Sequence, residues 1–93
     1  MIERTFIVKT RLGLHARAAA RLVRLATNFE SKLKLERLDG GITADAKSIL
    51  SVLMLAAAQG TELRAVAEGS DEEDAMNALE NFFSDGFGDS VQV

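Results

Sequence analysis

One histidine and a nearby arginine are the residues of this sequence whose types and spacing could do chemistry. His15 is the only histidine in the chain, and Arg17 follows it by two positions. A neutral imidazole is a nucleophile near pH 7. A guanidinium keeps its charge and binds two phosphate oxygens at once. The pair is therefore suited to accepting a phosphoryl group on the histidine and steadying it with the arginine.

The residues after His15 predict the helix that would position it. Apolar side chains recur with helical spacing at Ala18, Leu22, Leu25, Ala26 and Phe29. We therefore expect a helix from about Ala16 to Phe29, preceded by a break at Gly13. His15 then lies at the helix start, where N–H groups without helical partners and the helix dipole stabilise an anion such as phosphate.

Three arginines form a stripe along this predicted helix. Arg17, Arg21 and Arg24 lie at i, i+4 and i+7, roughly 100° around the helix from the centre of its apolar face. We expect the stripe to edge the site and to contact partners. The alternative is that His15 is an ordinary surface or structural histidine and that the stripe is a solvated helix face. Periodicity alone does not decide between them.

Residues 13–20 resemble the active-site signature of the HPr family, the histidine-containing phosphocarrier proteins of the bacterial phosphotransferase system. Further similar blocks follow in the same order at residues 46–50, 59–63 and 67–72. The resemblance covers about residues 2–85. It implies that enzyme I phosphorylates His15 on Nδ1, that Arg17 steadies the phosphoryl group, and that EIIA-type domains accept it. It also implies a stoichiometric carrier rather than an enzyme, with no cofactor and no metal.

Two positions depart from the family pattern. Ala18 stands where the family usually has proline, and the chain contains no proline. Leu12 stands where a small polar residue is common. Alanine is a strong helix former, so we expect the helix to persist. Neither change removes a reacting group.

A second, short helix is predicted at about Ser48 to Met54, and it is apolar on nearly all sides. A two-layer domain buries only one side of such a helix, so the other side is a candidate docking surface. The alternative is core packing, which we expect of Val52 and of Met54 or Leu55. By resemblance to the family, Ile49, Leu50 and Leu53 are the docking residues and lie beside His15.

Ser48 has two interpretations. Serine at a helix start is commonly an N-cap, and this needs no regulatory role to explain it. The family resemblance implies in addition that a dedicated ATP-dependent HPr kinase/phosphorylase phosphorylates Ser48 in those bacteria that have one. Such a phosphate would add a charge of about −1.5 to −2 beside the docking residues and hinder partners.

Length and composition indicate one small domain. The 93 residues allow a single modest core, which we assign to residues 1–88, with residues 89–93 expected as a mobile tail. The chain has no cysteine, and one histidine cannot make a multi-histidine metal site. No signal peptide is evident, and the longest apolar run, residues 52–58, is too short to span a bilayer. We expect a cytoplasmic monomer that does not insert into a membrane.

The net charge of −3 conceals an asymmetry. Residues 1–64 hold eleven Lys and Arg against six Asp and Glu, a net +5, whereas residues 65–93 hold none against eight, a net −8. The basic residues gather around His15 rather than forming an extended patch, which argues against nucleic acid as a partner. Acidic protein partners that present a phosphoryl group fit better.

The remaining patterns predict an α+β fold. Strands are expected at residues 2–9, 31–38, 42–44 and 61–68. A capping box of Ser70 and Glu73 is expected to start a last helix. The predicted buried face of that helix comprises Ala75, Ala78, Leu79 and Phe82, with Phe83 near its edge. The order βαββαβα predicts a two-layer open-faced sandwich with three helices on one face. The antiparallel strand order 1-4-2-3 is implied by the family resemblance.

Three functions remain open at this point. The first is a phosphocarrier that takes a phosphoryl group onto His15 and passes it on. The second is a regulatory, nitrogen-branch or kinase-controlled binding module, whose partners recognise the phosphorylation state of Ser48 or His15. The third is a small hydrolase that uses Arg17 to bind phosphate. Stable phosphohistidine without release of phosphate would count against the hydrolase.

Overall fold

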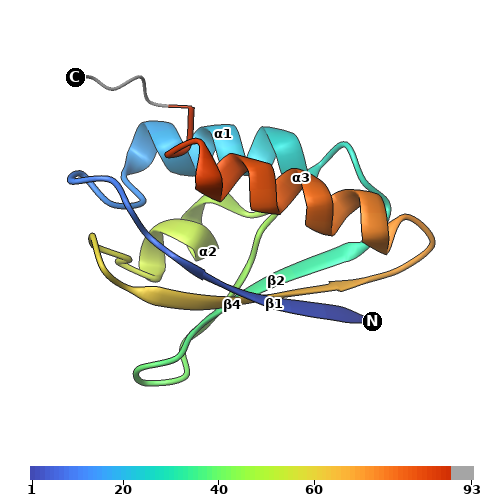
Figure 1. The fold of residues 1–93 in the computed structure, drawn as a ribbon, viewed down its shortest axis with the longest axis horizontal. Helices are drawn as coiled ribbons and strands as arrows, with labels where there is room; N and C mark the ends of the chain where they lie inside the picture. Colours follow the sequence, from blue (N-terminus) through green and yellow to red (C-terminus); the bar gives the residue numbers. More distant parts are fainter. Residues whose placement is uncertain (89–93) are drawn as a thin grey trace.

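The computed structural model describes residues 1–88 and forms two layers, a sheet and a layer of helices (Figure 1). Its elements in chain order are β1 (Ile2–Ile7), α1 (Ala16–Ala26), β2 (Lys32–Arg37), β3 (Thr43–Asp45), α2 (Ile49–Met54), β4 (Glu62–Glu68) and α3 (Glu72–Ser84). The sheet order is β1-β4-β2-β3 with every pair antiparallel, which confirms the expected topology. The expected mobile tail, residues 89–93, lies outside the described residues.

Alternation along the strands separates the two faces of the sheet, because successive side chains point to opposite sides. The side chains that face the helices are largely apolar and buried: Leu33, Leu35, Ala44, Leu63, Ala65 and Ala67. Cross-strand partners on this face meet directly, as Phe6 with Leu63 and Leu35 with Ala65. The opposite face carries mixed charges, and none of the three helices covers it (Figure 1).

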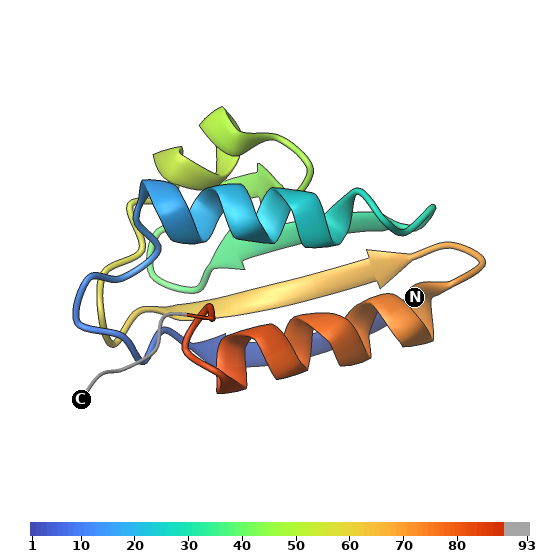
Figure 2. The same ribbon diagram turned by 90° about the horizontal axis from the view of Figure 1, so that it is seen from above.

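Helix α1 packs over the middle of the sheet, between α2 and α3 (Figure 2). Its buried residues are Ala18, Ala19, Leu22 and Ala26. Ala18 is fully buried within a continuous helix, which confirms the expectation that the helix persists without a proline at position 18.

Helix α1 ends at Ala26, three residues before the predicted end at Phe29. Thr27 is the C-cap, and the amides of Asn28 and Phe29 donate to the carbonyls of Leu25 and Ala26 in tighter turns, each at 3.2 Å. Phe29 still packs against the core from this turn. Because Phe29 is partly buried at helical spacing, the apolar pattern in the sequence continued past the actual end of α1.

The predicted capping box at the start of α3 is wrong. The N-cap is Asp71, and its side chain makes no cap hydrogen bond. The Asp71 carboxylate instead accepts the amide of Glu30 at 2.9 Å, the amide of Ser31 at 2.9 Å, and the Ser31 hydroxyl. A long-range tie to the α1–β2 loop thus takes the carboxylate away from the helix end. Glu72, rather than Glu73, reaches back to accept the amide of Gly69 at 3.0 Å.

The buried face of α3 is also rotated from the prediction. Met76 and Phe83 are fully buried with Ala75 and Leu79, while Ala78 and Phe82 are only half-buried. The sequence pattern also left Phe87 out of the core. Phe87 is 1% exposed at φ 64° and lies 5.2 Å, centroid to centroid, from the ring of Phe83. Its amide donates to the carbonyl of Phe82 at 2.9 Å, so the chain after α3 folds back over the helix.

Candidate functional site

His15 is the N-cap of α1, with extended backbone angles of φ −79° and ψ −178°. Its carbonyl accepts the amide of Ala19 at 2.8 Å, which is the first turn of the helix. The residue is half-buried, and its side chain makes no cap hydrogen bond. The predicted position at the helix start is therefore confirmed. The first-turn N–H groups and the positive end of the helix dipole lie beside this residue.

The loop before His15 is clamped against residues 57 and 58. Gly13 has φ +67°, and a Cβ there would lie 2.6 Å from the carbonyl oxygen of Ala57 and 2.9 Å from the Cα of Ala58. The amide of Leu14 donates to the same Ala57 carbonyl at 2.8 Å. The left-handed angle and the close backbone contact both require glycine at position 13. His15 is thus presented by a fixed segment.

The arginine stripe is spread along α1. Arg17 is exposed in the first turn, two residues from His15. Arg21 is half-buried, and its Nη1 donates to the carbonyl of Phe87 at 3.2 Å, which ties it to the chain after α3. Arg24 is exposed in the last turn, about 14 Å from His15 along the helix axis. Arg17 therefore adjoins His15, and Arg24 belongs to a more distant part of the surface.

Helix α2 has one buried and one exposed side. Val52 and Leu55 are fully buried, whereas Ile49 is 42% and Leu50 71% exposed, and Leu53 is half-buried. We call Ile49, Leu50 and Leu53 the docking patch. Because α2 packs beside α1 (Figure 2), the patch lies on the helix next to the one that begins at His15.

Met54 is exposed to 74%, so Leu55 and not Met54 fills the core position that the sequence left open between them. Met54 was not among the predicted docking residues. Its spacing of four from Leu50 could have placed it there, because residues four apart share one side of a helix.

Ser48 is the N-cap of α2, and its hydroxyl accepts the amide of Ser51 at 3.3 Å. The capping interpretation is therefore confirmed. The turn before it is held by Asp45, whose amide donates to the Ser51 hydroxyl at 3.0 Å and whose carboxylate accepts the amide of Lys47 at 2.9 Å. Ser48 is half-buried and directly precedes Ile49 of the docking patch.

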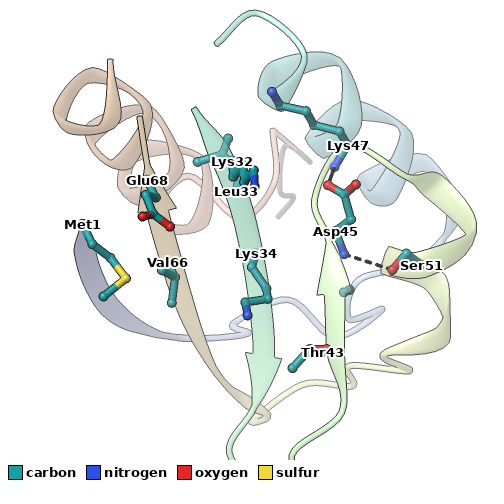
Figure 3. A pocket seen from close by; sticks show the side chains of 11 residues that line it. Met1, Lys32, Leu33, Lys34, Thr43, Asp45, Lys47, Ser51, Val66 and Glu68 are labelled. Atoms are coloured by element: carbon teal, nitrogen blue, oxygen red, sulfur yellow. Dashed lines mark hydrogen bonds between the residues drawn. The ribbon is translucent and has the colours of Figure 1, made fainter. Parts of the chain in front are cut away.

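Figure 3 shows a surface hollow whose lining does not include His15. It is lined by residues of β2, β3, β4, the turn into α2 and α2 itself, among them Lys34, Asp45, Lys47 and Ser51. The ammonium of Lys47 is held by the carbonyl of Phe29 at 2.7 Å. None of the predicted site residues lines this hollow.

Among residues 1–88, no three side chains of His, Asp, Glu or Cys are placed to hold a metal ion. Within the same range no helix is both long and apolar enough to cross a membrane.

Comparison with known proteins agrees with the residue pattern. The family model described as "PTS HPr component phosphorylation site" matches residues 2–85. The chain is 44% identical over 89 residues to phosphocarrier protein HPr of Cupriavidus necator, which covers 96% of this chain and 98% of that protein. It is 38% identical over 84 residues to phosphocarrier protein NPr of Proteus mirabilis, over 90% of this chain and 92% of that one.

The fold is also similar to that of a solved HPr structure. The crystal structure of HPr-C-His from Thermoanaerobacter tengcongensis superposes with a TM-score of 0.89 at 37% sequence identity. The match covers 98% of this chain and 100% of that one. Similarity in sequence and in fold thus spans at least 92% of the length of each of these relatives.

Proposed function

The chain belongs to the HPr family of phosphocarrier proteins of the phosphotransferase system, and we propose that it carries its phosphoryl group on His15. The observation that supports this assignment is the place of His15 at the N-cap of an 11-residue helix, with Arg17 exposed in the first turn. A phosphoryl group on the imidazole would lie near the first-turn N–H groups of α1 and a guanidinium, which stabilise its charge.

The transfer itself is a displacement at phosphorus. The lone pair of the His15 imidazole, on Nδ1 by resemblance to the family, forms the new N–P bond. The bond from phosphorus to the donor group of enzyme I breaks in line with it, and the donor leaves with the electron pair. Arg17 and the helix end offset the charge on the equatorial oxygens. A second displacement hands the group to an EIIA-type domain, so the carrier is used stoichiometrically and regenerated by the next donor.

Both partners are proposed to dock on one surface. The docking patch supplies apolar area on α2, and Arg17, Arg21 and Arg24 supply positive charge along α1. An apolar centre flanked by arginines suits a partner with an apolar anchor and an acidic rim. The protein is proposed to act as a monomer in the cytoplasm, without nucleic acid or a membrane as a direct partner.

Regulation at Ser48 is a further part of the proposal. The hydroxyl caps α2 immediately before Ile49 and Leu50, which are exposed. A phosphate there would place about two negative charges beside the apolar patch, and the cost of desolvating them would oppose docking. In organisms with an HPr kinase, phosphorylation at Ser48 would therefore lower transfer through His15 without touching the histidine.

The second candidate function is a regulatory, nitrogen-branch role with little part in sugar transport. The similarity to phosphocarrier protein NPr of Proteus mirabilis is the observation that favours it. Both functions use the same step at His15, so they differ in the acceptor. Rates of transfer to sugar-specific and nitrogen-branch EIIA domains, measured side by side, separate them.

The assignment of His15 is tested by intact mass after incubation with phosphoenolpyruvate, Mg²⁺ and enzyme I. The wild type is expected to gain one acid-labile phosphate, and the folded variant His15→Ala none. Arg17→Ala is expected to gain the phosphate more slowly, because it retains the nucleophile. A folded wild type that gains no phosphate from its cognate enzyme I would overturn the proposal.

A further inference from the structure

Arg37 is the last residue of β2, and its side chain closes the end of α2. It lies on the same side of the sheet as Leu33 and Leu35, which face the helices. Its Nη1 donates to the carbonyl oxygens of Leu55 at 2.8 Å and Ala56 at 3.1 Å. The last carbonyls of a helix have no helical partner and form the negative end of its dipole. Arg37 therefore supplies both donors and positive charge to that end of α2.

Asp39 fixes the orientation of this guanidinium. The Nε of Arg37 donates to Oδ1 of Asp39 at 3.0 Å, and its Nη2 donates to Oδ2 at 2.9 Å. This forked hydrogen bonding with Arg37 lowers the pKa of Asp39 and raises that of Arg37. The Arg37 side chain is only 21% exposed, while that of Asp39 is 70% exposed. The carboxylate thus orients the arginine from the solvent side.

The chain held by Arg37 leads directly to the support of His15. Ala56 has φ 49°, a left-handed angle that turns the chain sharply after α2. The next residue, Ala57, is 4% exposed, and its carbonyl accepts the amide of Leu14. Residues 55–57 therefore connect the docking helix on one side with the loop before His15 on the other.

We propose that Arg37 is a positioning residue for phosphoryl transfer, because its grip on the carbonyls of Leu55 and Ala56 fixes the docking patch relative to His15. This inference rests on the proposed function and deepens it. Arg37 touches no reacting atom. It acts through α2 and the Ala57–Leu14 hydrogen bond, which hold the docking patch and His15 in the arrangement that a partner binds, so that docking requires no prior rearrangement.

The test compares wild type with Arg37→Met, which keeps the length and apolar stem of the side chain but removes its donors. Two quantities are measured. One is the KM and kcat for phosphorylation by enzyme I. The other is the hydrogen-exchange rate of the Leu14 amide relative to that of the Leu35 amide in the central sheet. We expect KM to rise about fivefold with little change in kcat, and Leu14 exchange to accelerate about fivefold or more against Leu35.

Arg64→Met is the matched control. Arg64 lies on the neighbouring strand, but on the uncovered face of the sheet, where its Nε lies 3.5 Å from Oε1 of Glu36. It is expected to leave both measured quantities at the wild-type values. Arg37→Lys is expected to show a smaller rise in KM than Arg37→Met. Lysine keeps the positive charge and a donor, but it cannot make the two parallel hydrogen bonds to Asp39. If Arg37→Met does not fold, Asp39→Asn replaces it, since it loosens the guanidinium while leaving the arginine in place.

Three outcomes are distinguishable. A rise in KM together with selective acceleration at Leu14 supports the inference. Unchanged KM and Leu14 exchange in Arg37→Met or Asp39→Asn, or changes that only follow global unfolding, overturn it while the proposed function stands. A wild type that accepts no phosphate overturns the proposed function and this inference with it.

Discussion

At the scale of single residues, the position of the reacting groups depends on hydrogen bonds and close contacts made by neighbouring residues. His15 is presented by Gly13 and Leu14, which pack against Ala57 through one hydrogen bond and one contact too close for any side chain. At the far end of α1, Asp71 ties the start of α3 to Ser31. Neither arrangement takes part in the chemistry, and each gives a separate prediction.

Gly13→Ala is expected to lower the free energy of unfolding by about 2 to 4 kcal/mol. The added Cβ would be strained at the left-handed backbone angle and would also collide with the backbone of Ala57 and Ala58. Gly41→Ala is the matched control. Its φ of +73° is similar, and nothing lies within 4 Å of the added Cβ. It is expected to cost about 1 kcal/mol. Urea denaturation of both variants measures the difference, and equal losses would contradict the close contact at Gly13.

Asp71→Asn is expected to reduce the loss of stability in acid. Hydrogen bonds from the Ser31 hydroxyl and the Glu30 amide lower the pKa of Asp71 in the folded state. Its contribution is therefore complete above the unfolded pKa of about 3.9 and disappears as the pH falls through the lower folded pKa. Asp39 and Glu72 are shifted in the same direction, so part of the effect remains in the variant. Denaturation at pH 7 and in steps below pH 5 tests this, and the same decline in both proteins would refute it.

Residue type and spacing made His15 and Arg17 candidates for the proposed chemistry, and the family resemblance favoured that chemistry over an ordinary surface histidine. His15 and Arg17 stand out because few residue types accept or bind a phosphoryl group. Asp71 could not be placed correctly from the sequence, because its partners, Glu30 and Ser31, lie about forty positions away in the chain. The residues next to Ser70 indicated only a local capping motif. In the structure, the carboxylate of Asp71 instead accepts hydrogen bonds from Glu30 and Ser31.

At the scale of the elements, α2 is divided between stability and recognition. Val52 and Leu55 are fully buried, while Leu50 and Met54 are more than two-thirds exposed. The sequence showed that an all-apolar helix must leave one side exposed. It did not show whether Met54 or Leu55 is buried, because the end of α2 is held by Arg37, a residue of β2 that is distant in the sequence. Phe87 was missed for a similar reason. Its burial depends on a turn at positive φ, and a periodic pattern of apolar residues does not predict such a turn.

The two sides of α2 are expected to respond differently to substitution. Leu50→Ser should change the free energy of unfolding by less than about 0.5 kcal/mol and raise the KM for phosphorylation by enzyme I several-fold. Val52→Ala should lower the free energy of unfolding by about 2 kcal/mol and leave KM near the wild-type value while the protein remains folded. Denaturation and steady-state phosphorylation of both variants test the division. A loss of stability in Leu50→Ser as large as in Val52→Ala would contradict it.

At the scale of the whole molecule, charge is distributed unevenly over a chain with a net charge of −3. The arginines of α1 lie toward the proposed docking surface, and the first turn of α3 carries Glu72, Glu73 and Asp74. A protein partner with an acidic rim would be attracted to the surface around His15 and repelled by the side of α3. The fold class and the element order followed from the sequence patterns, whereas the strand order came from the family resemblance, because crossovers leave no local signal.

This distribution predicts a salt-dependent KM. Raising the salt from about 0.05 M to about 0.5 M shortens the Debye length from roughly 14 Å to roughly 4 Å and weakens attraction between the arginines and an acidic partner. The KM for enzyme I is expected to rise about three- to tenfold, with little change in kcat. Arg24→Ala, which is remote from His15, should flatten this dependence and leave kcat unaltered. A KM that does not respond to salt would exclude electrostatic docking.

The most direct measurement of the central claim follows the phosphoryl group itself. The phosphorylated protein is freed of enzyme I and phosphoenolpyruvate and mixed with an EIIA domain, and intact mass and inorganic phosphate are recorded over time. A phosphocarrier that uses His15 should lose its acid-labile phosphate as the EIIA domain gains one, without release of inorganic phosphate. Steady release of inorganic phosphate, or a phosphate that remains after His15→Ala, would contradict the account.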